Sequence, residues 1–234
     1  MIRALLFDTY GTVVDWRTSV LSELRSLTAR KALALDCVGF LDEWKAAYRP
    51  GMDRVNLGEI PWTTVDTIYR RRLEELLARY GITVLTGDEV DRLARVWWRL
   101  EPWPDAVPGL HRLKRRYIIS PLSNASFIGM VELARSAGLP WDCILTAENA
   151  RWYKPRPEVY RSATSLLGLT PGEIMMVAAH NYDLAAARRE GLATAFIPRP
   201  LEHGPGQTTD LVAEESWDVV AKDLEDLSDR LGTS

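Results

Sequence analysis

The first sixteen residues, Met1–Trp16, read MIRALLFDTYGTVVDW and place a carboxylate almost at the end of an apolar run. Residues 3–7 (RALLF) have the nearly continuous hydrophobicity of a strand that is buried on both faces of a parallel sheet. Asp8 follows directly, and parallel α/β sheets bind their ligands outside the carboxyl ends of the strands. The stretch therefore predicts a parallel α/β core with an acid at its ligand-binding edge.

Similar short apolar runs recur along the chain, and helical patterns lie between them. The further runs cover residues 117–123, 143–147, 174–179 and 192–197. Glycine follows the expected helices that end at residues 137, 167 and 190, and glycine is a common helix stop. Pro121 lies inside the second run and would remove one hydrogen-bond donor from it. The pattern predicts a Rossmann-like α/β fold, and from residue 214 a last helix, alone or after a strand.

Residues 16–100 follow a different pattern. Strand-like runs are missing there, and helical periodicity covers residues 19–28, 40–48, 65–80 and 89–100. The stretch ends in EPWPDAVP (residues 101–108), whose prolines indicate a stiff connector. We therefore expect a core domain of residues 1–15 and 101–234, with residues 16–100 as an all-helical insertion.

Composition limits the classes of partner. The chain has 234 residues, 47% of them hydrophobic, a formal net charge of -3 and dispersed basic residues. Nucleic-acid binding proteins concentrate basic charge on one face, so we expect no nucleic-acid partner. No apolar stretch has the length of a membrane span, and the start does not resemble a signal peptide. With two cysteines and no disulfide framework, we expect a cytoplasmic protein without a membrane partner.

Polar side chains gather where the predicted strands end. The carboxyl ends of parallel strands meet at one edge of the sheet, so residues that follow different strands are expected to lie close together there. Acids, a lysine, hydroxyls and amides occupy these positions: Asp8, Tyr10 and Thr12 after the first run, Ser123 and Asn124 after the second, Lys154 beyond the third, and His180, Asn181 and Asp183 after the fourth.

Four of these segments also resemble the ordered motifs of a known superfamily. FDTYGTVVD (residues 7–15), PLSNAS (121–126), YKPRPEVY (153–160) and MMVAAHNYDLAAARREG (175–191) are similar to the four motifs of the haloacid dehalogenase superfamily. The insertion at residues 16–100 lies where that superfamily carries its cap domain. The branch that the chain resembles most is the type II L-2-haloacid dehalogenases, which implies hydrolysis of short 2-haloalkanoic acids without a metal or another cofactor, in a homodimer.

Two positions separate this branch from the magnesium-dependent phosphatases of the superfamily. The phosphatases need a second aspartate two residues after the nucleophile, where this chain has Tyr10, and an acidic metal ligand where it has Ala179. Magnesium prefers hard oxygen ligands in octahedral geometry, which these residues do not supply. A phosphatase and a non-catalytic small-molecule-binding protein remain the alternatives, because the fold alone does not determine the function.

The resemblance also implies a role for each motif residue. Asp8 would attack the halogen-bearing carbon and form an ester, which water then hydrolyses. Lys154 would keep Asp8 ionised, since a nearby cation favours the charged form. Asp183 would orient Lys154 or activate the water. The other implied site residues bind the substrate carboxylate or support the nucleophile: Ser123 with the N–H groups of Thr9 and Tyr10, together with Thr12, Asn124 and Tyr160.

The residues that would bind the leaving halide depart from the pattern of the family. The family places an arginine after a tryptophan of the cap, and this chain has Lys45 after Trp44, with Arg49 and Arg54 as nearby alternatives. His180 stands where the family has an asparagine, and Ala178 where it often has a serine. Lysine is a flexible point charge rather than a planar fork. We expect Lys45 and His180 to bind the halide and hypothesise that they form a shorter pocket that favours fluoride.

Overall fold

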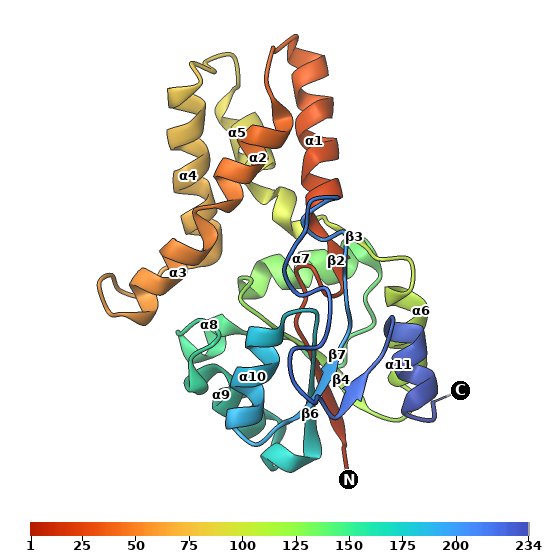
Figure 1. Cartoon of the computed structure of the whole chain (residues 1–234). Helices are drawn as coiled ribbons and strands as arrows, with labels where there is room; N and C mark the ends of the chain where they lie inside the picture. Colours follow the sequence, from red (N-terminus) through yellow and green to blue (C-terminus); the bar gives the residue numbers. More distant parts are fainter. Residues whose placement is uncertain (234) are drawn as a thin grey trace.

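A computed structural model describes residues 1–233 and has a central sheet with helices on both sides and a helical unit beyond one end (Figure 1). Within these residues the sheet has the order β5-β4-β1-β6-β7-β8, and every recorded strand pair in it is parallel. Its strands are β1 (Ala4–Phe7), β4 (Ile118–Ser123), β5 (Leu145–Thr146), β6 (Ile174–Ala178), β7 (Ala193–Phe196) and β8 (Val219–Val220). The predicted α/β class is thus confirmed.

Successive residues of β1 point to opposite faces of the sheet, and both faces are buried, which explains why the strand is apolar throughout. Leu5 and Phe7 belong to one buried cluster, and Ala4 and Leu6 belong to another. The first cluster includes residues of α6 (Ala106–Leu113), α7 (Phe127–Ala137) and α11 (Leu224–Arg230). The second includes residues of α9 (Pro157–Leu167) and α10 (Asn181–Arg189). Both faces of the strand are therefore covered, and β1 lies at the centre of the sheet.

Two details of the core follow from its sequence. Pro121 lies within β4 opposite Phe7, and the ladder between β4 and β5 begins after it, at Leu122. The polar tail forms the strand β8 followed by α11, so the strand-plus-helix alternative is correct. A short helix α8 (Ala147–Ala150) and a 3-10 turn η2 (Pro171–Glu173) complete the core.

The inserted helices are α1 (Trp16–Lys31), α2 (Cys37–Lys45), α3 (Tyr48–Asn56), α4 (Val65–Arg79) and α5 (Gly87–Ala94), followed by the 3-10 turn η1 (Arg95–Trp98). Figure 1 shows them as the red-to-yellow part above the sheet. The single helix expected over residues 40–48 was wrong, because α2 ends at Lys45 and α3 starts at Tyr48. Pro50 is tolerated in the first turn of a helix, where its missing N–H costs nothing, but it would break a continuous one.

A short antiparallel pair joins the insertion to the core. β2 (Val14–Asp15) pairs with β3 (Glu101–Pro102) at the points where the chain enters and leaves the insertion. Just beyond β3, the backbone N–H of Trp103 donates to the carbonyl of Val13 at 3.0 Å. These contacts support our proposal that residues 16–100 form the cap domain and residues 1–15 and 101–234 the core domain.

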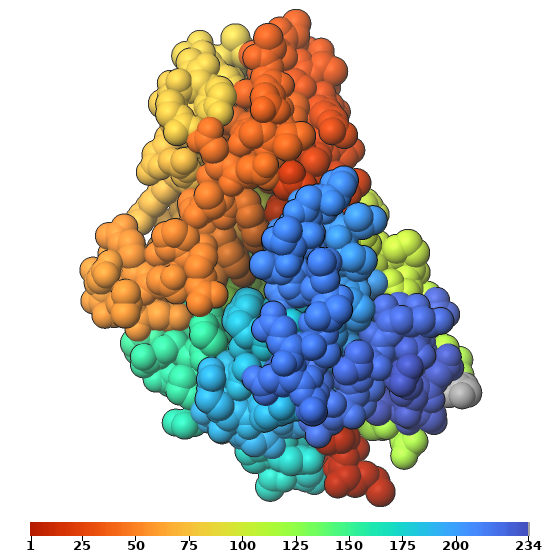
Figure 2. All heavy atoms as spheres, in the orientation of Figure 1, coloured from red at the N-terminus to blue at the C-terminus, as the bar shows by residue number. Residues whose placement is uncertain are grey.

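The segment after β7 also contacts the insertion. Figure 2 shows the blue chain near residue 200 lying against the red and orange helices. At this contact the indole Nε1 of Trp16 donates to Glu202 Oε1 at 3.0 Å, and the rings of Trp16 and His203 are 5.6 Å apart. In the part of the chain that the structure describes, no helix combines the length and the hydrophobicity of a membrane span.

Candidate active site

The predicted site residues meet where β1, β4 and β6 end. Asp8 follows β1, Ser123 is the last residue of β4, and His180 lies two residues beyond β6. Lys154 comes from the loop between α8 and α9, and it is almost fully buried. The four motif segments, which are far apart in the sequence, thus form one cluster.

Asp8 is the centre of this cluster. Lys154 Nζ donates to its Oδ1 at 2.8 Å, and the Thr12 hydroxyl donates to its Oδ2 at 2.8 Å. His180 Nδ1 lies 3.1 Å from the same Oδ2. Burial alone would raise the pKa of Asp8, but Lys154 and His180 hold it well below its ordinary value. The side chain is therefore a carboxylate at neutral pH.

Lys154 also binds a second carboxylate. Its ammonium group donates to Asp183 Oδ2, and the other oxygen, Oδ1, accepts a hydrogen bond from the Tyr160 hydroxyl at 2.5 Å. Burial lowers the pKa of Lys154, but Asp183 and Asp8 together raise it above its ordinary value. Burial raises the pKa of Asp183, against the effect of Lys154. Lys154 thus stays a cation between the two acids.

Amide and hydroxyl groups fix the surrounding backbone. Asn124 bonds both backbone groups of Lys154, with its Oδ1 2.9 Å from the N–H and its Nδ2 3.4 Å from the carbonyl oxygen. Thr12 Oγ1 accepts from the N–H of Ala179 at 2.9 Å and so connects the turn after β1 to the end of β6. Ser123 Oγ accepts from the N–H of Ala125 at 3.2 Å.

The turn after Asp8 leaves polar groups without protein partners. Among residues 1–233, the buried Thr9 Oγ1 atom has no hydrogen-bond partner. In the same range, no recorded hydrogen bond uses the N–H of Thr9 or Tyr10 as a donor. The Tyr10 hydroxyl donates to the carbonyl of Trp97 in the insertion at 3.1 Å. These polar groups beside Asp8 are therefore available to a ligand.

Lys45 reaches the site from the end of α2 within a group of aromatic rings. Its ammonium nitrogen is 3.9 Å from the ring centre of Tyr48 and 4.7 Å from that of Trp16, and it donates to the Tyr69 hydroxyl at 3.2 Å. Burial lowers the pKa of Lys45 to about 8, although Glu202 and Asp8 oppose the change. The insertion therefore brings a cation towards the carboxylates.

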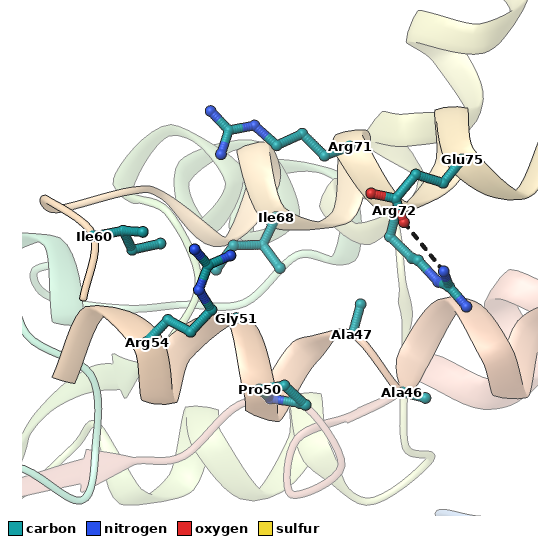
Figure 3. Close-up of a pocket in the computed structure, with 10 residues that line it drawn as sticks. All are labelled: Ala46, Ala47, Pro50, Gly51, Arg54, Ile60, Ile68, Arg71, Arg72 and Glu75. Atoms are coloured by element: carbon teal, nitrogen blue, oxygen red, sulfur yellow. Dashed lines mark hydrogen bonds and ion pairs between the residues drawn. The ribbon is translucent and has the colours of Figure 1, made fainter. Parts of the chain in front are cut away.

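Arg49 and Arg54, the two alternative arginines, are each paired with another acid. Arg49 is bonded to Asp53 at 3.1 Å and lies over the ring of Tyr182, 5.3 Å from its centre. Arg54 lines a separate hollow of about 340 Å³ between α3 and α4 (Figure 3). The lining of that hollow does not include Asp8, Lys154 or Asp183. Of the three cations considered for the halide, Lys45 is the one on whose pKa Asp8 and Glu202 act, whereas Arg49 is paired with Asp53 and lies at the edge of the cluster, over Tyr182.

Sequence reasoning missed Glu202. This residue is 3% exposed, and its Oε2 lies 2.9 Å from His180 Nε2. It belongs to a Pro/Gly-containing stretch to which no role was assigned. Its position after the last apolar run, β7, was the available signal, because every other strand that contributes to the site does so from its carboxyl end.

A divalent cation does not fit this donor set. Lys154 and His180 contact both oxygens of Asp8, Ala179 has no side-chain oxygen, and the Tyr10 hydroxyl is bonded to Trp97. Over residues 1–233, no group of three or more His, Cys, Asp or Glu side chains is arranged to hold a metal ion.

Comparison with known proteins identifies the family. A family model described as haloacid dehalogenase-like hydrolase matches residues 2–191. The chain belongs to this family. The haloacid dehalogenase-like fold also agrees with a solved L-2-haloacid dehalogenase, PA0810, at a TM-score of 0.96 and 47% identity over 100% of both chains.

Other relatives of this haloacid dehalogenase-like hydrolase carry similar descriptions. The structure of the defluorinating L-2-haloacid dehalogenase Rha0230 matches at a TM-score of 0.95 and 48% identity, covering 98% of this chain and 95% of that one. The (S)-2-haloacid dehalogenase 4A of Burkholderia cepacia is 26% identical and covers 95% of this chain and 96% of the relative. The predicted relationship to the L-2-haloacid dehalogenases is therefore confirmed.

Proposed function

We propose that the protein hydrolyses short 2-haloalkanoic acids to 2-hydroxyalkanoic acids through an ester on Asp8. The observation that carries the proposal is a buried aspartate at the centre of the sheet edge, with a lysine on one oxygen and no second acid at position 10. The relatives that match over nearly the whole chain are haloacid dehalogenases. They support an enzyme that acts on carbon–halogen bonds.

In the first step, a carboxylate oxygen of Asp8 attacks carbon 2 of the substrate. The new carbon–oxygen bond forms as the carbon–halogen bond breaks, and the halide leaves with the bonding pair. The low pKa of Asp8 supports this role because the side chain is ionised over the whole physiological range. Lys154 and Thr12 hold the carboxylate in one orientation, which lowers the entropic cost of the attack.

In the second step, water adds to the carbonyl carbon of the Asp8 ester. The bond between that carbon and the ester oxygen, which came from Asp8, then breaks, the 2-hydroxyacid leaves, and the carboxylate of Asp8 is restored with one oxygen from water. Of the two protons of the water, one ends on the hydroxyl of the departing 2-hydroxyacid and the other passes to a base. Asp183 suits this role, because its raised pKa makes it a better proton acceptor and Lys154 and Tyr160 fix both of its oxygens.

The substrate carboxylate needs donors, and the site has them. We assign this role to the hydroxyl of Ser123 and to the N–H groups of Thr9 and Tyr10. Ser123 Oγ accepts one hydrogen bond, from Ala125, and its own proton remains available to a ligand. The unpartnered Thr9 Oγ1 lies on the same turn. The aromatic side chains around Lys45 favour a short alkyl chain.

We assign the halide side to His180 and Lys45 and expect fluoride to be accepted. Fluoride is the strongest hydrogen-bond acceptor among the halides, so cationic N–H donors favour it over larger halides. The similarity at 48% identity to a relative described as defluorinating supports this expectation.

One experiment tests the proposal. The wild type is incubated with L-2-chloropropionate and with fluoroacetate, with and without EDTA, and released halide is measured. We expect release that EDTA does not change and that disappears in Asp8→Asn, whose amide is a poor nucleophile. Absence of halide release from any haloacid, or release that persists in Asp8→Asn, would contradict the proposal. Magnesium-dependent hydrolysis of p-nitrophenyl phosphate would favour the phosphatase alternative instead.

We also propose a cellular location and an oligomeric state for the protein. We infer a cytoplasmic location because Cys37 and Cys143, both within the described residues, are free thiols, as is usual in a reducing compartment. We expect a homodimer, as the resemblance to the haloacid dehalogenases implies. Cell fractionation and light scattering of the purified protein test these two expectations.

A further inference from the structure

His180 lies between two carboxylates. Its Nδ1 is 3.1 Å from Asp8 Oδ2, and its Nε2 is 2.9 Å from Glu202 Oε2. An ionised carboxylate only accepts hydrogen bonds, whereas a neutral imidazole has one donor and one acceptor nitrogen. A neutral ring would therefore turn a lone pair towards one of these oxygens. A doubly protonated ring satisfies both contacts.

Glu202 is held in place from several directions. Its Oε1 accepts from the indole of Trp16 at 3.0 Å, and His203 Nε2 lies 3.7 Å from the same oxygen. Gly11 has φ +92°, and a Cβ atom there would lie 2.2 Å from the carboxyl carbon of Glu202. Glycine at position 11 thus allows the carboxylate to approach the turn that carries Asp8. The contact with His180 is built from the nucleophile turn, the insertion and the segment after β7.

The charges around His180 balance when the ring is protonated. The groups that face the ring, directly or across these carboxylates, are Asp8 after β1, Tyr182 and Asp183 on α10, Glu202 and His203 after β7, Lys45 on α2, and Lys154. Arg49 lies over the ring of Tyr182, but its charge is paired with Asp53. The carboxylates of Asp8, Asp183 and Glu202 then match the cations Lys154, Lys45 and His180. Unpaired buried charge is costly, so this balance favours the imidazolium.

We propose that Glu202 is a positioning residue that keeps His180 as an imidazolium beside Asp8, so that the departing halide meets a charged N–H donor. The inference rests on the proposed dehalogenation. When Asp8 becomes an ester it loses its negative charge, and the Nδ1–H of His180 loses its carboxylate partner. The halide carries away the same unit of negative charge from the side of carbon 2 opposite the attacking oxygen, and the imidazolium N–H turns from the ester oxygen towards the halide. Fluoride gains most, because it is the strongest hydrogen-bond acceptor among the halides.

The titration behaviour of the pair agrees with this arrangement. Burial opposes a charged ring, but Glu202 and Asp8 raise the pKa of His180 well above its ordinary value. Burial also raises the pKa of Glu202, yet His180 and His203 keep it below its ordinary value. Removal of the Glu202 charge should therefore lower the pKa of His180 towards its ordinary value.

The direct test is an NMR titration of the ring nitrogens. The chain has three histidines, so substitution of His111 and His203 by glutamine in turn assigns the signals. In the wild type we expect His180 to carry protons on both nitrogens at pH 8. In Glu202→Gln it should become neutral by that pH, and Glu202→Asp, which keeps the charge, should restore the wild-type signal. A neutral His180 in the wild type, or the same titration in Glu202→Gln, would overturn the proposal.

Activity provides the second readout. Glu202 also raises the pKa of Lys45, so the comparison is made in a Lys45→Arg background, where the cation at position 45 does not titrate. In that background we expect Glu202→Gln to lower the rate ratio of fluoroacetate to bromoacetate at pH 8 by about tenfold, the usual effect of losing the charge of one hydrogen-bond donor. The ratio should recover at lower pH, where His180 is protonated again. A ratio that is unchanged at all pH values would contradict the halide role. The NMR titration does not depend on turnover. Failure of the dehalogenation proposal, seen as no halide release by the wild type, can therefore be distinguished from failure of the Glu202–His180 proposal, seen in the NMR titration.

Discussion

Lys45 stands where the resemblance to the dehalogenase branch implies an arginine in the insertion. Burial lowers its pKa to about 8, whereas an arginine at the same place would stay charged at every accessible pH. The cation is present below pH 8 and is lost above it. The activity of the wild type should therefore depend on pH in a range where that of an arginine enzyme does not.

Lys45→Arg tests this dependence. We expect the rate of halide release by the wild type to decline as the pH rises above about 8, and that decline to be absent or shifted upward in Lys45→Arg. Lys45→Met, which keeps most of the apolar stem, should lower the rate at all pH values by about tenfold or more. The measurement is a pH–rate profile with chloropropionate. The same alkaline decline in Lys45→Arg would assign the titration to another group.

At the scale of elements, two asparagine amides hold consecutive residues of the loop that carries the lysine. Asn124 of the core bonds the N–H and the carbonyl of Lys154. Asn56, at the end of α3, bonds the N–H and the carbonyl of Tyr153 at 2.9 and 3.0 Å. Tyr153 also donates its hydroxyl to the carbonyl of Thr63 at 2.6 Å and stacks on Trp62. The insertion thus helps to position Lys154.

Loss of the Asn56 contact should affect catalysis more than substrate binding. We expect Asn56→Ala to lower kcat by about tenfold, because Lys154 orients the Asp8 nucleophile and small displacements of that nucleophile have large effects on the rate. The free energy of unfolding should fall by about 1–2 kcal/mol. Asn56→Asp keeps the acceptor for the Tyr153 N–H but loses the donor, so its kcat should be intermediate. A rise in KM with unchanged kcat would argue against this role.

Arg199 connects several elements beneath the site. Its Nη1 and Nη2 donate to the two oxygens of Asp105 at 2.7 Å, and its Nε donates to the carbonyl of Thr12 at 2.9 Å. Asp105 also accepts from the N–H of Leu224 at the start of α11. We expect Arg199→Met to lower the free energy of unfolding by about 3 kcal/mol, because it leaves a largely buried carboxylate without its partner.

A surface pair provides the control for this prediction. Arg54 Nε lies 3.5 Å from Glu59 Oε2, and the two side chains are 59% and 54% exposed. Arg54→Met should change the free energy of unfolding by about 0–1 kcal/mol, as is usual for exposed ion pairs. Urea unfolding of both variants compares the two values. Equal losses would show that burial of the Arg199 pair does not matter.

At the scale of the whole molecule, the sequence predicted the parts that depend on local patterns. The buried strands were predicted because they are apolar on both faces, and Asp8, Ser123 and Asp183 because they lie at the ends of such strands or within a few residues beyond them. Glu202 and Asn56 were missed because their partners are distant in sequence: Glu202 bonds Trp16, and Asn56 bonds Tyr153. The start of α3 was missed because Pro50 and Gly51 resemble a turn.

The charge cluster should also make the stability of the fold depend on pH. The pKa of His180 in the folded protein lies above the ordinary value of 6.5, so its contribution to stability is complete below pH 6.5. This contribution is lost as the pH rises through the folded-state pKa. We expect the difference in the free energy of unfolding between the wild type and Glu202→Gln to shrink from pH 6.5 to pH 9.5. Urea titrations measure it, and a constant difference would contradict the expectation.

The turn that carries Asp8 continues directly into β2, and this continuity matters for chimeric enzymes. The ring of Trp97 in the insertion lies 6.3 Å from that of Tyr10, centre to centre, and the Tyr10 hydroxyl donates to the Trp97 carbonyl. A cap grafted from a relative with junctions at residues 15 and 101 would keep Asp8 but replace the ring beside Tyr10. A recombinant with junctions outside residues 8–103 would carry the turn and its partners together. Exchange of substrate preference between relatives is therefore expected to succeed only when nucleophile and cap are transferred as one block.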